Sequence, residues 1–227
     1  MSQPTAWSGP GMILSFFKLR ESSSLSEKTL EDWFDQEFGP SLMALGVIKS
    51  AWLYQAANAS YDKQNAILYE VPDLALIQAG KLQEASRISK LGLFQGSVDD
   101  HIELDTRLYS FVERAAPVIL MAMIQPAPGG EADLDAWYRQ EHNEQMSKEP
   151  GYWRTTRLSL LHQNSTGKAQ SEKLSFLAIH AFGDGNTLGT EVKPLDPITD
   201  WTKKVMSEAK GMDVAIYHKR KVFGAKS

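Results

Sequence analysis

Hydrophobic runs separated by turn-forming residues divide the chain into alternating predicted strands and helices. Short apolar runs bounded by Gly, Pro or Asn are typical of strands, and longer stretches with helical spacing are typical of helices. In the first half, the predicted strands are residues 12–19, 50–57, 66–71 and 105–113, and the predicted helices are 26–44 and a helix within 73–91. In the second half, the predicted strands are residues 117–125, 154–161, 173–182 and 213–223, and the predicted helices are 133–148 and 197–210. Each half is therefore predicted to run strand, helix, strand, strand, helix, strand.

The two halves also share a sequence motif. The pattern L-x-x-W, aromatic, x-Q-E, ring occurs from Leu30 to Phe38 and again from Leu134 to His142, at a constant offset of 104 residues. In each half, the motif follows an apolar run and precedes a strand-like run. A strand–helix–strand unit that occurs twice is the ferredoxin-like pattern, in which helices cover one face of an antiparallel sheet and the other face must be buried elsewhere.

We therefore predict an α+β fold with two tandem ferredoxin-like (βαββαβ) repeats. The repeats are expected at residues 12–115 and 116–224, after a flexible N-terminal tail of residues 1–11. Because each sheet has one face without helices, we expect the two sheets to pack together as an intrachain dimeric α+β barrel.

The composition excludes several classes of protein. The 227 residues are 42% hydrophobic and 23% charged, which is typical of a globular protein. The net charge of −4 leaves no basic excess to neutralise a phosphate backbone, so nucleic acid is not expected as a partner. The absence of cysteine excludes disulfides, thiolate nucleophiles, thiolate-bound zinc and iron–sulfur clusters.

No membrane partner is expected either. The longest apolar run, Val118 to Ile124, is far shorter than the roughly 20 residues that span a bilayer. The N-terminus has neither the basic start nor the apolar stretch of a signal peptide. We therefore expect a cytoplasmic protein.

The motif helix of the second half carries two candidate groups for proton transfer. On a helical wheel, Glu141 lies within the apolar stripe that Leu134, Trp137 and Tyr138 form. A carboxylate there is costly unless it is hydrogen-bonded, and the equivalent Glu37 of the first half favours a structural role. Glu141 then accepts hydrogen bonds from backbone amides or from an arginine such as Arg154 or Arg157. The alternative is a general acid or base whose pKa is raised by burial.

His142 lies on the flank of the same stripe, and its counterpart in the first half is Phe38. A ring is therefore present at both positions, but only the second half has titratable nitrogens. Histidine is the side chain best suited to moving protons near neutral pH. His142 is either a structural residue bonded to a carbonyl near Pro150 or the proton-transfer group of a single working pocket.

A second histidine lies in a predicted strand. Alternation places Phe176, His180 and Phe182 on one face, which suits a flat hydrophobic ligand or an ordinary sheet core. Tyr217 is a further candidate, because it could donate a hydrogen bond to a developing enolate. Its counterpart Tyr109 makes a packing role equally consistent.

The stretch from Leu134 to His142, followed by Pro150-Gly-Tyr-Trp153, resembles the W-Y-x-x-E-H…P-G-W motif of EthD-like proteins. That family belongs to the dimeric α+β barrel superfamily, and the tandem arrangement is similar to fungal EthD-domain proteins. The superfamily includes polyketide cyclases, decarboxylases, lactone isomerases, cofactor-free monooxygenases and haem enzymes. The resemblance therefore implies the fold and leaves the reaction open.

The resemblance and the absence of nucleotide-binding and metal-binding motifs together favour a cofactor-independent enzyme of secondary metabolism. It is expected to act on a hydrophobic aromatic or polyketide-like small molecule by proton transfer, as a cyclase, decarboxylase or isomerase. The alternatives are a cofactor-free or haem-dependent monooxygenase or oxidase and a non-catalytic small-molecule binding protein. No metal is expected, and a homodimer is compatible with the sequence. The candidate catalytic residues are His142, His180, Tyr217 and Glu141, and the candidate substrate-binding residues are Trp137, Tyr138, Phe176, Phe182 and Arg157.

Overall fold

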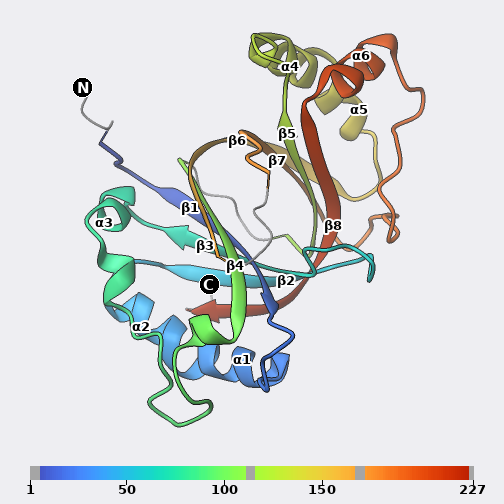
Figure 1. Ribbon diagram of the computed structural model, residues 1–227. Helices are drawn as coiled ribbons and strands as arrows, with labels where there is room; N and C mark the ends of the chain where they lie inside the picture. The colour runs from blue at the N-terminus through green and yellow to red at the C-terminus, as the bar shows by residue number, and fades with distance from the viewer. Residues whose placement is uncertain (1–5, 111–115, 167–171, 225–227) are drawn as a thin grey trace.

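The fold is a closed, eight-stranded antiparallel barrel with helices on its outside (Figure 1). The computed structural model describes residues 6–110, 116–166 and 172–224. The first five residues of the predicted tail, residues 111–113 of the predicted strand 105–113 and residue 115 at the predicted repeat boundary lie outside these ranges.

The eight described strands coincide with the hydrophobic runs of the sequence. They are β1 Gly11–Leu19, β2 Ser50–Ala56, β3 Asn65–Val71, β4 Ile102–Tyr109, β5 Val118–Gln125, β6 Tyr152–Ser165, β7 Phe176–Phe182 and β8 Gly211–Gly224. The α-helices are α1 Glu27–Trp33, α2 Gly39–Ala44, α3 Leu74–Gln78, α4 Glu131–Trp137, α5 Asn143–Met146 and α6 Asp200–Glu208. Two π-helical turns, η1 Phe34–Phe38 and η4 Tyr138–His142, and two 3₁₀ turns, η2 Lys81–Glu84 and η3 Val98–Asp100, complete the described elements.

Both halves of the barrel have the same strand order. Around the barrel, the strands run β1-β3-β2-β8-β5-β7-β6-β4 and return to β1. The first half therefore contributes β4-β1-β3-β2, and the second half contributes its corresponding strands in the same order, β8-β5-β7-β6. The halves are joined where β2 pairs with β8 and where β4 pairs with β6.

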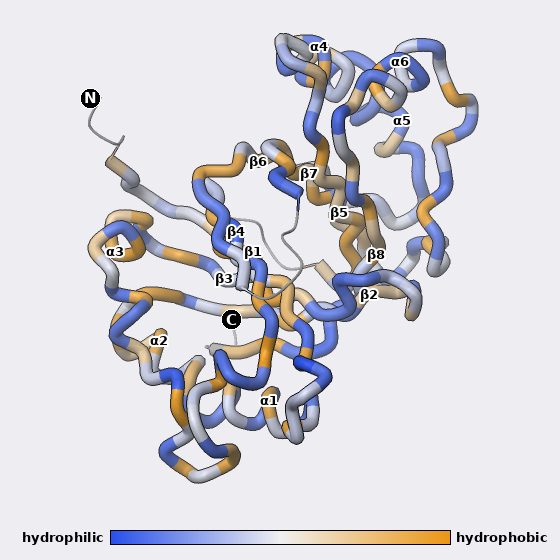
Figure 2. Tube along the Cα trace, viewed as in Figure 1, coloured by the Kyte–Doolittle hydropathy of each residue, from blue (hydrophilic) through white to orange (hydrophobic). Residues whose placement is uncertain are grey.

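The strands are buried on both faces, one against the barrel interior and one against the helices. In β7, Leu177 and Ile179 belong to the core inside the barrel, whereas Ala178 packs with the core beneath α4. Burial on both faces explains why β5 is an almost unbroken hydrophobic run and not an alternating one (Figure 2). The helices α4, α5 and α6 lie together over the second half, and α1 and α2 lie over the first (Figure 1).

Two predicted helices differ from the sequence-based expectation in the same way. The segments 26–44 and 133–148 are not continuous α-helices, because each contains a π-helical turn at the repeated motif, η1 or η4. The two turns lie 104 residues apart and cover equivalent positions. A π turn adds a residue to the helical repeat, so a wheel drawn at 100° per residue loses its phase beyond Tyr138.

The ends of several other helices and strands differ from the predicted ends, because backbone conformation and strand pairing set them. The helix predicted within 73–91 is reduced to α3 and η2, since Gly80 at φ +82° ends α3 in the left-handed region. The strand predicted at 154–161 extends to Tyr152–Ser165 because its far end pairs with β4. The strand predicted at 173–182 begins only at Phe176, where its pairing with β5 and β6 begins.

Gly151, just before β6, is predicted to tolerate no side chain. Its φ is +73°, and an added Cβ would lie 2.5 Å from the backbone nitrogen of Asn186. We expect Gly151→Ala to lower the free energy of unfolding by about 2–4 kcal/mol, measured by urea denaturation. Gly129→Ala is the matched control, because Gly129 has φ +82° with no atom within 4 Å of the added Cβ, so it should lose only about 1 kcal/mol. Equal losses in the two variants would contradict the steric argument.

Candidate active site

Four aromatic rings of the second half meet between the π turn η4 and the outer face of the sheet. His142 stacks on Trp137 with ring centroids 4.2 Å apart, and Tyr138 stacks on His180 at 6.3 Å. The two imidazoles are in edge contact, with centroids 5.3 Å apart. The π turn places Tyr138 and His142 on the sheet side together, and β7 presents His180 to them. The structure thus brings together four of the nine predicted site residues.

His180 is held by a short chain of hydroxyl groups. Its side chain is 1% exposed, and its Nδ1 lies 2.7 Å from Oγ1 of Thr155, its neighbour across the β6–β7 pairing. Oγ1 of Thr155 in turn lies 2.9 Å from the hydroxyl of Tyr152. Burial, reinforced by the nearby His142, lowers the pKa of His180 to about 3. His180 is therefore uncharged at neutral pH.

His142 is also uncharged at neutral pH, but its ring nitrogen is not satisfied. Burial lowers the pKa of His142 to about 4, and the charge of Glu141 opposes the shift. Its Nδ1 is buried and has no hydrogen-bond partner among the described residues. The expected bond to a carbonyl near Pro150 is therefore not made by Nδ1. A buried, unpaired imidazole nitrogen is able to accept a proton from a bound molecule.

Glu141 has partners other than those expected from the sequence. Its Oε1 accepts hydrogen bonds from Nε1 of Trp137 at 3.2 Å and from the hydroxyls of Thr199 and Thr202 at 2.5 and 3.1 Å. Instead of the arginines or backbone amides expected, the described partners of Oε1 include two threonines that α6 brings from some 60 residues further along the chain. Since Thr199 caps α6, Glu141 joins the motif helix to that helix. These contacts favour the structural role.

A cleft of about 350 Å³ lies beside the four rings, between α4 and the strands β5, β6 and β7. Tyr138 lines this cleft and also contacts both histidines. Arg157 lines it too: its guanidinium lies 4.9 Å from the Tyr138 ring centroid and forms an ion pair with Asp135. Burial raises the pKa of Tyr138, and Arg157 opposes the rise. The other residues around the cleft include Leu134, Ile124, Leu158, Ser159, Phe176 and Ala178.

Of the remaining predicted site residues, Phe176 lies at the cleft as expected, whereas Phe182 and Tyr217 lie elsewhere. Phe182 is on the same face of β7 but packs in a separate core, with its ring 5.8 Å from that of Tyr152. Tyr217 lies inside the barrel, where its hydroxyl donates to the carbonyl of Lys63 at 2.8 Å. Tyr217 and His180 are therefore on opposite faces of the sheet and do not share a site.

Sequence reasoning missed Thr155 and Asp135. Thr155 contacts His180 only because the two residues are opposite each other in the β6–β7 register. Asp135 is the ion-pair partner of Arg157, and the Arg157 guanidinium also donates to its backbone carbonyl at 3.3 Å. The sequence offered no signal for the first contact. The acidic residue one turn before Tyr138 was the available signal for the second.

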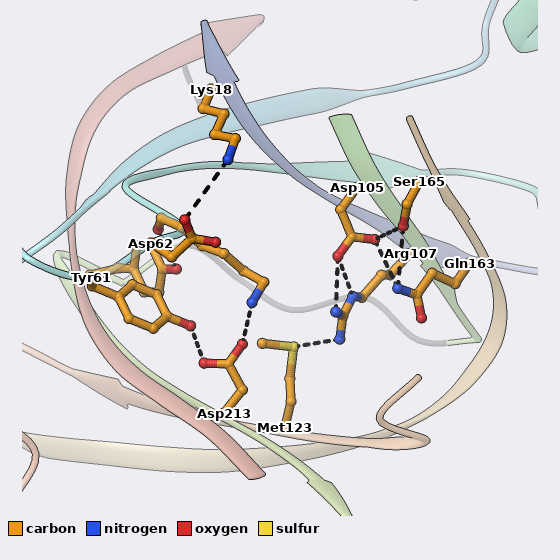
Figure 3. Close-up of polar contacts among 11 residues, drawn as sticks. Lys18, Tyr61, Asp62, Asp105, Arg107, Met123, Gln163, Ser165 and Asp213 are labelled. Atoms are coloured by element: carbon orange, nitrogen blue, oxygen red, sulfur yellow. Dashed lines mark hydrogen bonds and ion pairs between the residues drawn. The ribbon is translucent and has the colours of Figure 1, made fainter. Parts of the chain in front are cut away.

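Sequence reasoning also missed a charged cluster inside the barrel (Figure 3). Arg107 is 0% exposed, and its guanidinium donates to Oδ2 of Asp105 at 2.9 Å and to the sulfur of Met123 at 2.8 Å. The other oxygen of Asp105 accepts from Gln163 and Ser165, both at 3.1 Å. These contacts connect β4 with β6 across one junction of the two halves.

A second ion pair connects the halves near Arg107. Lys63 lies 2.5 Å from Asp213, and the Tyr61 hydroxyl donates to the same carboxylate (Figure 3). Burial and this carboxylate raise the pKa of Tyr61. These charges are paired, so they explain how a polar cluster is tolerated inside an otherwise apolar barrel.

The described residues contain no group of three or more His, Asp or Glu placed to hold a metal ion. Among the same residues, no helix has the length and apolar character needed to cross a bilayer.

Solved structures share this fold at very low sequence identity. A Fusobacterium nucleatum protein provisionally named a monooxygenase has a TM-score of 0.54 at 10% identity, covering 96% of this chain and 95% of that one. An anthrone oxidase-like protein has a TM-score of 0.50 at 10% identity, covering 96% and 94%. A protein provisionally named a chlorite dismutase has a TM-score of 0.50 at 10% identity, covering 94% and 95%.

These likenesses show the fold alone: the chain shares its eight-stranded antiparallel barrel with these proteins. No protein-family model matches the chain, and no curated protein matches it significantly.

Proposed function

We propose that the second half binds a hydrophobic aromatic or polyketide-like small molecule in the cleft and removes a proton from it without a cofactor. The observation that carries this proposal is the pair of buried, uncharged imidazoles 5.3 Å apart, both in contact with the Tyr138 ring that lines the cleft. The cleft volume of about 350 Å³ is within the range of small-molecule sites.

The proposed step is proton abstraction from an acidic carbon of the bound molecule. The C–H bond breaks, the proton passes to Nδ1 of His142 once the Tyr138 ring turns aside, and the electron pair enters an enolate that the aromatic system delocalises. The Arg157 guanidinium, at the edge of the cleft, stabilises the negative charge, and the Tyr138 hydroxyl orients the substrate. His180, which Thr155 holds in place, packs against His142 and Tyr138. Its imidazole is a second group that could take the proton.

The fate of the enolate separates two candidate functions. Return of the proton to a different atom gives an isomerase. Attack of the enolate carbon on a carbonyl group of the same molecule, whose oxygen then takes the proton from His142, gives a cyclase. In a decarboxylase, the proton that His142 takes is that of a carboxyl group; the C–CO₂ bond then breaks, CO₂ leaves, and the proton returns to the carbon. Reaction of the enolate with dioxygen gives an oxidase or monooxygenase, a candidate supported by the names of the similar structures, which include an anthrone oxidase-like protein. Both candidates share the same first step, so the role of His142 is common to them.

We also propose that each half is one ferredoxin-like βαββαβ repeat of the EthD-like type. Support comes from the identical strand order in the two halves and from the π turns at equivalent motif positions. A role in secondary metabolism, a cytoplasmic location and a homodimer stay predictions.

The arrangement around the histidines does not fit a haem. An axial imidazole needs a nitrogen that faces an open space of porphyrin size. His180 is buried and its Nδ1 is hydrogen-bonded to Thr155. Trp137 stacks on the imidazole of His142, and Tyr138 stacks on the imidazole of His180. Visible absorbance of the purified protein tests this point directly.

The proposal is tested by deuterium exchange into two flat carbon acids, anthrone and 2-tetralone, in D₂O without oxygen. We expect the protein to accelerate exchange at the acidic carbon of at least one probe, measured by NMR. His142→Phe copies the first-half residue Phe38 and keeps the ring stack on Trp137, so it should reduce exchange by roughly 10²–10³-fold without unfolding the protein. His162→Phe is the control, because His162 is exposed and far from the cleft, and it should exchange like the unaltered protein.

Admission of air then separates the two candidates. Oxygen uptake that depends on His142 favours the oxidase, and its absence favours the isomerase or cyclase. Exchange no faster than in protein-free solution, or equal exchange in His142→Phe, would contradict the proposed role of His142.

A further inference from the structure

The first half has an unpaired indole at the position where the second half has a paired one. Nε1 of Trp137 donates to Glu141 at 3.2 Å and to Thr202 at 3.0 Å. The equivalent Nε1 of Trp33 is buried, in a side chain 3% exposed, and has no hydrogen-bond partner among the described residues. A buried donor without a hydrogen-bond partner lowers the free energy of unfolding by about 1–3 kcal/mol. The unpaired N–H of Trp33 therefore needs a physical explanation.

The difference arises because the equivalent glutamate binds elsewhere. Glu37 accepts hydrogen bonds from the Ser89 hydroxyl at 2.6 Å and from the backbone amide of Lys90. Burial acts to raise the pKa of Glu37, but these two hydrogen bonds outweigh it and lower that pKa. Glu37 is therefore committed to the loop after α3 and is not available to Trp33.

Trp33 lines a pocket of about 90 Å³ between the motif helix and the first-half sheet. This is several times the roughly 10–15 Å³ that a single water needs, and it is of the order of one aromatic ring. The walls are mainly aromatic and aliphatic, and include Phe34, Phe38, Ile13, Ile67, Leu53 and Phe223. An apolar pocket of this kind stays dry and binds small apolar molecules.

The pocket also has a small polar part. The hydroxyls of Ser15 and Thr106, 3.2 Å apart, belong to its lining, as does Tyr69. Two charged residues, Glu31 and Arg87, also line it, and each is ion-paired with a residue outside the lining, Arg220 and Asp99 respectively. Burial raises the pKa of Tyr69, so its hydroxyl stays protonated. Because Phe38 replaces the histidine of the second half, no imidazole lies beside this pocket.

We infer that the first half carries a second ligand site, which binds a single uncharged aromatic ring bearing a hydrogen-bond acceptor. The ring packs among Phe34, Phe38 and the aliphatic wall, and its acceptor receives the N–H of Trp33. The site binds without catalysing proton transfer, since no imidazole is among its described lining residues. The inference does not depend on the proposed function of the second half.

The test uses pyridine and benzene, which have the same shape but differ in one acceptor nitrogen, at neutral pH where pyridine is uncharged. We expect pyridine to shift the Trp33 indole N–H resonance downfield in ¹⁵N-labelled protein, and benzene to bind without that downfield shift. The resonance is assigned by its loss in Trp33→Phe. In that variant, pyridine should bind roughly tenfold more weakly, while the affinity for benzene changes less than twofold.

Each probe's affinity for Trp33→Phe is compared with its affinity for the unaltered protein. The different hydration free energies of pyridine and benzene cancel in this comparison. The other five indole N–H resonances can be assigned by their own Trp→Phe variants, so the NMR experiment stays decisive if Trp33→Phe is poorly folded. His142→Phe, which disables the proposed reaction of the second half, should leave pyridine binding at Trp33 unchanged. A Trp33 resonance that pyridine does not shift at the concentration at which benzene saturates water, or an equal loss of affinity for both probes in Trp33→Phe, would overturn the inference.

Discussion

Lowering the pH from 7 to 5 should reduce the free energy of unfolding by about 4 kcal/mol, about 2 kcal/mol for each of two histidines. The folded-state pKa values of His142 and His180 are about 4 and about 3, against 6.5 for an unperturbed histidine. Between pH 6.5 and 4, the unfolded chain therefore binds protons that the folded protein does not. Stability is present above pH 6.5 and is lost as the pH falls through this window.

Urea denaturation at a series of pH values measures this loss. The carboxyl groups of Glu37, Asp99 and Asp135 have lowered pKa values, so they contribute a loss mainly below pH 4.5 and leave the histidine window clear. His142→Phe should remove about half of the loss between pH 7 and 5, and His162→Phe should leave it unchanged. A flat profile over this range in the unaltered protein would show that the two imidazoles are hydrated in solution.

Arg107→Met should lower the free energy of unfolding by about 3–5 kcal/mol. The reason is that Asp105, 7% exposed, would remain in the barrel as a buried carboxylate without its cation. Gln163 and Ser165 still donate to it, but they do not neutralise its charge. Denaturation by urea or heat gives the difference.

Two comparisons separate the buried charge from simple loss of packing. The double variant Arg107→Met with Asp105→Asn should recover much of the loss, since a neutral amide replaces the unpaired charge. Lys28→Met removes an exposed ion pair to Asp32 and should change stability by less than about 0.5 kcal/mol. A loss below about 1 kcal/mol for Arg107→Met would mean that water reaches Asp105.

The positions of the strands and of the two motif helices could be predicted, because they depend on the spacing of apolar residues close together in the chain. Every predicted strand overlaps an observed one, since runs such as Val118 to Ile124 are too short and too apolar for anything but a strand buried on both faces. The motif with its offset of 104 residues indicated two equivalent helices, and both carry it on π turns. The sequence left open whether His142 and His180 meet, and the π turn η4 decided it by placing His142 over the face of β7 that carries His180.

The candidate site was less predictable wherever a contact depends on register or on distant segments. Glu141 was expected to bind an arginine, but Thr199 and Thr202 reach it from α6. Tyr217 was expected with the histidines, but the alternation of β8 turns it into the barrel. Thr155 meets His180 only because of the β6–β7 pairing.

The amino-acid sequence by itself determined the order and type of the main elements, the duplication, and the single histidine that distinguishes the second motif from the first. These properties depend on residues close together in the chain, where spacing controls which face is apolar. Only the tertiary structure decided that Trp137 is paired and Trp33 is not, and that Arg107 is neutralised inside the barrel. Asp105 and Glu141 are close to Arg107 and Trp137 in the chain, but Thr202 reaches Trp137 from α6, and only the closed barrel buries the pair of Arg107 and Asp105. The tertiary structure therefore sets which side chains share a buried space.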